Sequence, residues 1–170
     1  MCDGSCLAVA NPTRFTITDE GHTSVLDVAG GGTTNGSHVI LYHPNGGYNQ
    51  QWRRRPAGYA GRYDRLVSVY AGKCMDVDNG PWSRLGSRMN VWTCHPRASR
   101  ADTQNFDIEH LVPWLPNLHT VSSEGTGFSL NVAGGGTADN TPIIQWTQEF
   151  NRPYPGWNES FYFHPVINFK

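Results

Sequence analysis

The chain has 170 residues, and its 13 Lys and Arg against 14 Asp and Glu leave a formal net charge of -1. That length allows one sizeable hydrophobic core, and the near-neutral charge argues against general binding of a phosphate backbone, so we expect no nucleic-acid partner. No run approaches the roughly 18 apolar residues of a membrane helix, and the amino terminus lacks a signal-peptide pattern, so we expect no membrane insertion.

With 19 Gly, 11 Pro and 12% aromatic residues, the composition favours turn-rich β structure. Segments rich in β-branched and aromatic residues lie between Gly, Asn, Asp and Pro, and they predict twelve short strands. These strands cover residues 15–18, 25–28, 38–42, 51–54, 66–69, 74–77, 89–92, 105–108, 118–121, 128–131, 143–146 and 161–163. Helical apolar spacing is missing, so helices should be few.

The sequence contains an internal repeat. Residues 26–33 (LDVAGGGT) return as residues 130–137 (LNVAGGGT), with a weaker copy at residues 75–80 (MDVDNG). A large aromatic follows the acidic or amide residue of each copy after 15 or 16 positions, at Tyr42, Trp92 and Trp146. A polar-then-aromatic tetrapeptide closes each unit, at residues 49–52 (NQQW), 103–106 (TQNF) and 158–161 (NESF). Three landmarks in one order, three times over, predict threefold repetition.

Each repeat holds four of the predicted strands in about 50 residues, too few to bury a core alone. A closed barrel shared by three units removes most free strand edges. We therefore predict an all-β, pseudo-threefold β-trefoil. Its repeats would cover about residues 14–57, 62–113 and 117–166 within a single domain of residues 14–170, after an amino-terminal leader of residues 1–13.

The order of Asp or Asn, an aromatic about 15 positions on, and then Asn-Gln-x-Trp resembles the ricin B-type lectin family, which includes fungal members. The resemblance runs from Phe15 to Pro165, and residues 49–52 carry the complete motif. It implies a β-trefoil that binds glycans of galactose or N-acetylgalactosamine type in up to three shallow pockets, named α, β and γ. It implies no catalysis and no cofactor.

The residue types suit a sugar for physical reasons. A hexose needs a carboxylate or amide for its hydroxyls and an aromatic floor for its C–H face. In the first repeat, the resemblance makes Asp27 the hydroxyl acceptor, Tyr42 the stacking platform and Asn49 a second polar contact. Gly30 permits close approach of the sugar to the backbone, and Gln50 supports Asp27. Tyr42 replaces the more common Trp.

The other two repeats depart further from the pattern. The third keeps Gly134, Trp146 and Asn158 but has Asn131 in place of Asp and Glu159 in place of Gln, which removes the charge-assisted acceptor. We therefore rank the pockets α, then γ, then β.

The second repeat keeps Asp76, Asn90 and Trp92, with Gln104 as support, but has Thr103 in place of Asn. Trp52, Phe106 and Phe161 are expected in the core as structural support. The acidic and amide residues also fit simple turn positions, and the platform aromatics also fit ordinary barrel positions, so both interpretations stay open.

Four cysteines bear on the compartment. In the resembled family a disulfide sits where Cys74 and Cys94 lie, and it would favour secretion. The missing signal pattern leaves a cytoplasmic location open. Cys2 and Cys6 lie in the leader, where they could pair, stay free or cross-link chains.

The residues also bear on other functions. The seven histidines show no zinc-ligand spacing and the chain has no nucleophile motif, so we expect no metal site and no enzyme. Residues 95–103 and 148–157 are unrepeated loops that leave a β-trefoil protease inhibitor as the alternative. The basic cluster at residues 53–55 is typical of a solvated sheet edge. A second copy of the chain is also a candidate partner, in a homodimer.

Overall fold

The computed structural model describes residues 14–21, 23–57, 61–96, 101–148 and 156–166. These residues form twelve β-strands and five short 3-10 helices. The strands are β1 (Phe15–Asp19), β2 (Val25–Val28), β3 (Ser37–Tyr42), β4 (Trp52–Pro56), β5 (Asp64–Ser68), β6 (Cys74–Val77), β7 (Met89–Trp92), β8 (Phe106–His110), β9 (Leu118–Ser123), β10 (Ser129–Val132), β11 (Ile143–Trp146) and β12 (Phe161–Pro165). The predicted all-β fold with twelve short strands is confirmed.

Three features of the sequence fall partly or wholly outside the described residues. The predicted leader, with Cys2 and Cys6, occupies residues 1–13. Residues 97–100 and 149–155 belong to the two long loops that suggested a protease inhibitor.

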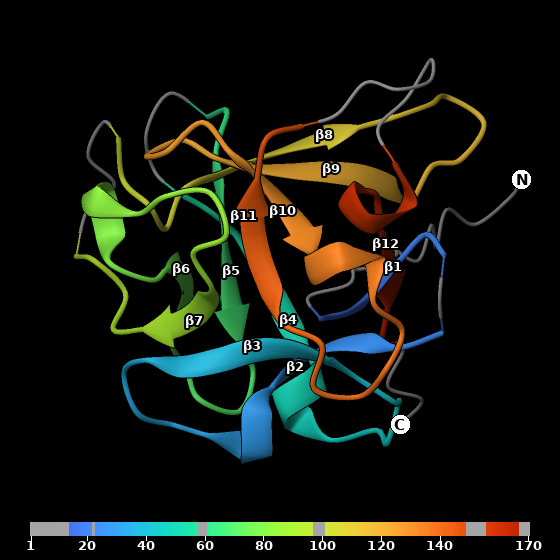
Figure 1. The fold of residues 1–170 in the computed structure, drawn as a ribbon, viewed down its shortest axis with the longest axis horizontal. Coiled ribbons are helices and arrows are strands. Elements are labelled where there is room, and N and C mark those ends of the chain that lie inside the picture. The colour runs from blue at the N-terminus through green and yellow to red at the C-terminus, as the bar shows by residue number, and fades with distance from the viewer. Residues whose placement is uncertain (1–13, 22, 58–60, 97–100, 149–155, 167–170) are drawn as a thin grey trace, which may run out of the picture.

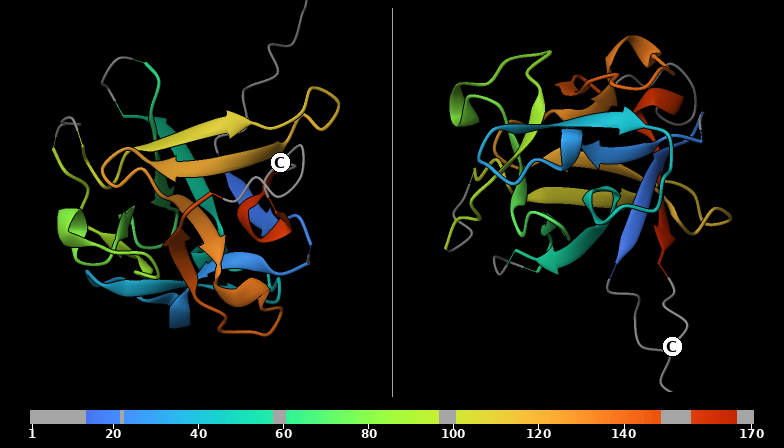
Figure 2. Two further views of the ribbon diagram at one scale, coloured as in Figure 1. Left: turned by 45° about the horizontal axis from the view of Figure 1, so that its top comes forward. Right: turned by 90° about the horizontal axis from the view of Figure 1, so that it is seen from below.

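Six strands close into a barrel, which Figures 1 and 2 show from three directions. Strand β1 pairs with β12 and β4, β4 with β5, β5 with β8, β8 with β9, and β9 returns to β12, all antiparallel. Because the ring closes, each of these six strands pairs with a neighbour on both sides.

The remaining strands form one hairpin per repeat: β2 with β3, β6 with β7, and β10 with β11. The hairpins meet one another through the pairing of β3 with β7 and the bridges Ile40–Pro142 and Arg88–Ile144. Together they cap one end of the barrel. The three hairpins are equivalent, because the acidic or amide residue of each occupies the third position of its first strand.

The core takes one large aromatic from each repeat. Trp52, Phe106 and Phe161 open β4, β8 and β12, and each has 0% of its surface exposed. The indole Nε1 of Trp52 donates to the carbonyl oxygen of Leu26 at 3.1 Å, which satisfies its buried N–H. The strand that carries Leu26 also carries Asp27, so core packing fixes the position of this polar side chain.

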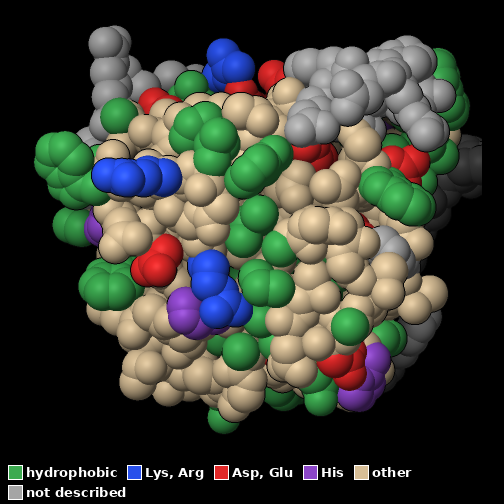
Figure 3. All heavy atoms as spheres, viewed as in Figure 1, with side chains coloured by type: hydrophobic (Ala, Val, Ile, Leu, Met, Phe, Trp, Pro, Cys, Tyr) green, Lys and Arg blue, Asp and Glu red, His purple; other side chains and the backbone are tan. Residues whose placement is uncertain are grey.

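Few charges mark the face shown in Figure 3, and Lys, Arg, Asp and Glu of both signs are scattered over it. Arg54, of the basic cluster, pairs with Asp64 on the neighbouring strand at 2.5 Å. In the part of the chain that the structure describes, no helix is long and apolar enough to span a membrane.

Cys74 and Cys94 form a disulfide, with their Cα atoms 5.0 Å apart, which confirms the pairing that the family resemblance implied. Cys74 begins β6 and Cys94 lies two residues beyond Trp92, the last residue of β7. The bridge therefore ties the two strands of the second hairpin at their open end.

We predict that replacing both cysteines with Ala lowers the free energy of unfolding by about 3 kcal/mol, because a bridge over a loop of this length restricts the unfolded chain. Urea denaturation of the oxidised wild type and the double variant measures the difference. The wild type in reducing agent is the matched control and should behave like the variant. Equal stability of all three samples would contradict the prediction.

Candidate functional site

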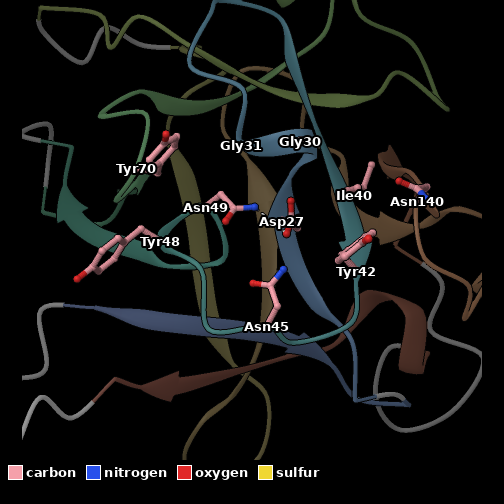
Figure 4. A pocket seen from close by; sticks show the side chains of 10 residues that line it. All are labelled: Asp27, Gly30, Gly31, Ile40, Tyr42, Asn45, Tyr48, Asn49, Tyr70 and Asn140. Atoms are coloured by element: carbon pink, nitrogen blue, oxygen red, sulfur yellow. Dashed lines mark hydrogen bonds between the residues drawn. The ribbon is translucent and has the colours of Figure 1, made fainter.

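A pocket of about 570 Å³ opens beside the first hairpin, and Figure 4 shows it from close by. Its lining residues are Asp27, Gly30, Gly31, Ile40, Tyr42, Asn45, Tyr48, Asn49, Tyr70 and Asn140. The structure thus brings together the four residues that the sequence assigned to the α pocket. In Figure 4, Asp27 and Asn49 lie at the centre, between Tyr42 on one side and Tyr70 on the other.

Asp27 is the one carboxylate among these lining residues, and only 3% of its surface is exposed. Its Oδ2 atom accepts hydrogen bonds from Asn49 Nδ2 and Gln50 Nε2, both at 2.9 Å. Its Oδ1 atom accepts none from the described residues, so one carboxylate oxygen remains for a bound molecule. Burial raises the pKa of Asp27, and the hydrogen bonds from Gln50 and Asn49 partly oppose that rise.

Gln50 fixes this arrangement. It lies in the 3-10 helix Tyr48–Gln50, and 1% of its surface is exposed. Its Nε2 atom also donates to the carbonyl of His43 at 2.9 Å, and its Oε1 atom accepts the N–H of Asn45 at 2.9 Å. One amide therefore holds both the acid and the loop that follows Tyr42.

The loop after β2 leaves room above the acid. Gly30 and Gly31 both have positive φ, 60° and 63°. No atom lies within 4 Å of the place where a Cβ on Gly30 would stand. A side chain there would be strained and would enter the open space of the pocket.

Tyr42 ends β3 and stacks on His43, with ring centroids 4.3 Å apart. His43 is held in turn by Asp139 of the third repeat: its backbone N–H donates to Oδ1 at 2.7 Å, and Nδ1 lies 2.7 Å from Oδ2. The hydrogen bond from His43 lowers the pKa of Asp139. The aromatic platform is thus braced by a neighbouring repeat.

The β pocket has the same frame with fewer free groups. Gln104 copies Gln50, because it donates to Asp76 Oδ2 at 2.8 Å and to the carbonyl of Thr93. Thr103 donates its hydroxyl to Asp76 Oδ1 at 2.6 Å, and the N–H of Val77 donates to the same atom. Both oxygens of this acid are therefore engaged within the protein.

Two further substitutions distinguish the β pocket. Asn79, with φ 66°, stands where the first repeat has Gly30. Asn90 lies opposite Asp76 on β7, where the first repeat has Ile40 opposite Asp27, and 2% of its surface is exposed. Trp92, by contrast, is 44% exposed.

The γ pocket, of about 320 Å³, is lined by Asn131, Gly134, Ile144, Trp146, Asn158 and Glu159. Here the amide and the acid have exchanged places. Asn131 donates its Nδ2 to Glu159 Oε1 at 3.0 Å, and its Oδ1 accepts from Asn158 Nδ2 at 3.2 Å. A hydrogen bond between a carboxylate and an amide still joins the hairpin to the 3-10 helix, but the amide is now on the hairpin and the carboxylate on the 3-10 helix. The sequence showed the loss of Asp and the loss of Gln as separate changes and did not reveal this relation.

Sequence patterns missed the residues that reach the α pocket from elsewhere. Tyr70 comes from the second repeat and Asn140 from the third, so no motif within the first repeat could identify them. Tyr48 and Asn45 flank the closing motif and were detectable only as polar or aromatic neighbours of Asn49. Among the described residues, no cluster of three His, Cys, Asp or Glu side chains is placed to hold a metal ion.

A family model described as a ricin-type beta-trefoil lectin domain-like family matches residues 7–92. No curated protein sequence matches the chain. The designed threefold-symmetric protein ThreeFoil has a similar structure, with TM-score 0.78 and 23% identity over 91% of this chain and 99% of that chain.

Two lectin structures share the fold. A ricin B-like lectin of Macrolepiota procera, in complex with lactose, has TM-score 0.67 and 19% identity over 93% of this chain and 99% of its own. The C-half of an earthworm R-type lectin, in complex with GalNAc, has TM-score 0.66 and 17% identity, over 91% and 100%. The chain also spans 30% of an exo-beta-1,3-galactanase from Clostridium thermocellum and 18% of a mosquitocidal holotoxin. At these identities the likeness establishes the fold alone.

The reversed pair in the γ pocket generates a prediction about stability. Asn131→Asp alone places two carboxylates in contact and should lower the free energy of unfolding by about 2 to 4 kcal/mol. The double variant Asn131→Asp/Glu159→Gln copies the pair of the α pocket and should recover all but about 1 kcal/mol. Urea denaturation of the wild type, both single variants and the double variant measures the coupling free energy of the two side chains as a double-mutant cycle. Additive losses would show that these two side chains are not coupled.

Proposed function

This chain belongs to the ricin-type beta-trefoil lectin domain-like family, and we propose that it binds glycans of galactose or N-acetylgalactosamine type, mainly through the α pocket. The observation that carries the proposal is the free Oδ1 atom of Asp27, whose carboxylate is held by Gln50 and Asn49 in the pocket that Tyr42 also lines. A carboxylate oxygen accepts hydroxyl hydrogen bonds about twice as strongly as a neutral acceptor.

The geometry suggests how a hexose would bind. Two neighbouring hydroxyls donate to Asp27, and the C–H face of the ring rests on Tyr42, whose ring contacts that of His43. The open space over Gly30 lets the ring approach the backbone. The lactose and GalNAc complexes of the two lectin structures support this sugar class.

The other pockets are proposed as weaker sites. In the γ pocket the hydroxyl acceptor is an amide already engaged by Asn158, although Trp146 provides a platform that is 36% exposed. In the β pocket both oxygens of Asp76 are occupied. We therefore propose a lectin with one dominant pocket per chain and glycans as its partners.

We propose binding without catalysis. Hydrolysis of a glycosidic bond generally uses two carboxyl groups that flank the bond. The α pocket offers Asp27 alone among the described residues that line it, together with amides and aromatic rings. Such a set binds a sugar but cannot supply both an acid and a base.

The first test of this function is the variant Asp27→Asn, which keeps the shape of the side chain and removes its charge. Loss of one charge-assisted hydrogen bond should weaken binding about tenfold to over a hundredfold. A glycan array selects the best-bound glycan, and calorimetry measures its affinity. The matched control is Asp76→Asn in the β pocket, which should leave the dominant binding unchanged. Equal affinities for Asp27→Asn and the wild type would contradict the assignment.

The raised pKa of Asp27 predicts a pH dependence. The sugar hydroxyls need the charged form, so affinity should fall as the pH drops through the raised pKa, at a pH above that of an unperturbed Asp. The free energy of unfolding should change in the opposite direction to the affinity. The folded state binds the proton of Asp27 more tightly than the unfolded chain does, so Asp27 stabilises the fold more as the pH falls through the raised pKa.

Affinity and the free energy of unfolding, measured in parallel across the acid range, separate local titration from acid unfolding. Asp27→Asn is the control, because its residual affinity should not change in the same pH window. A wild-type affinity that stays constant until the protein unfolds would contradict the prediction.

A further inference from the structure

The α pocket is larger than the γ pocket, about 570 Å³ against 320 Å³. It is also the one of these two whose lining includes side chains from all three repeats. Asn140 enters from the third repeat and Tyr70 from the second, and in Figure 4 they lie on opposite sides of Asp27.

Asn140 stands at a position where the other repeats have glycine. Its backbone has φ 69°, and the equivalent residues Gly36 and Gly86 have φ 85° and 83°. The equivalence rests on the hydrogen bonds: the N–H of each donates to a strand of the neighbouring repeat, at the carbonyls of Leu41, Val91 and Gln145. Glycine adopts this conformation without strain, whereas Asn is one of the few other residues that tolerate it.

The position lies beside the stacking aromatic. A Cβ on Gly36 would come within 3.9 Å of the Trp92 ring, and one on Gly86 within 3.8 Å of the Trp146 ring. Asn140 carries a real side chain at this place, exposed and next to Tyr42. The α pocket therefore has an amide at the rim of its platform that the other two pockets lack.

Tyr70 provides a second aromatic surface across the pocket. It lies in the turn between β5 and β6 and is 55% exposed, and neighbouring Tyr48 is 57% exposed. A Cβ on Gly31 would lie 3.6 Å from the Tyr70 ring, so the Gly-rich loop beside Asp27 packs close to this ring. The second repeat has Asp102 in the place of Tyr48, and it is buried in an ion pair with Arg65.

We propose that the α pocket binds a glycan of at least two sugar units, a deepening that rests on the proposed function. The first unit lies on Tyr42, donates to Asp27 and contacts the amide of Asn140. The second unit lies against the ring of Tyr70. The third and second repeats thereby extend a pocket whose central groups belong to the first.

Calorimetry with galactose and lactose tests both ends of the pocket. The wild type should bind lactose more tightly than galactose. Asn140→Gly keeps the backbone conformation and should weaken binding of both sugars about two- to tenfold, the worth of one net hydrogen bond. Tyr70→Ala should weaken lactose binding at least several-fold more than galactose binding, and Tyr70→Phe, which keeps the ring, should retain most of the lactose affinity.

A matched control excludes general effects. Trp114→Ala removes an aromatic that is 73% exposed and lies outside the pocket. It should titrate like the wild type. Unchanged affinities in Asn140→Gly, or equal losses for the two sugars in Tyr70→Ala, would overturn the proposal even if Asp27→Asn still weakens binding as expected. A wild type that binds neither these sugars nor any glycan on an array would overturn the proposed function itself.

Discussion

One hydrogen bond per repeat holds each pocket together. It joins a side chain at the third position of the hairpin's first strand to a side chain just before the repeat's fourth strand. Asp27 with Gln50, Asp76 with Gln104, and Asn131 with Glu159 make it at 2.9, 2.8 and 3.0 Å. All six side chains are at least nine-tenths buried. A buried polar group without a partner is costly, so neither member can change alone without cost. The exchange in the third repeat obeys that constraint because both members changed together.

What varies around this bond is the number of acceptor atoms that each pocket leaves free. In the first repeat the bond from Gln50 and the one from Asn49 share a single oxygen of Asp27, and the other oxygen stays free. In the second repeat Thr103 takes the second oxygen of Asp76. The first two pockets therefore differ by one free carboxylate oxygen.

The sequence was sufficient for the fold and for naming four residues that line one pocket, Asp27, Gly30, Tyr42 and Asn49. Strand signals, the threefold landmarks and the family resemblance act within single repeats, and the structure has all twelve strands and the disulfide where they were predicted. Which oxygen of Asp76 is occupied depends on side-chain rotamers, which spacing does not encode. Tyr70 and Asn140 reach the pocket only because the barrel closes, and no periodicity within the first repeat could predict side chains supplied by the other two.

Contacts between repeats brace the first and second pockets. The loop of the third repeat braces the first pocket through Asp139 and His43. The loop of the first repeat braces the second pocket in the same way, because Asn35 Oδ1 accepts from both the N–H and the hydroxyl of Thr93 at 3.0 Å. A single repeat cut from the chain would keep its own acid or amide and its own aromatic but lose this bracing. The first two repeats thus differ in their pocket atoms but share this contact with a neighbouring repeat, because Asp139 and Asn35 occupy equivalent positions.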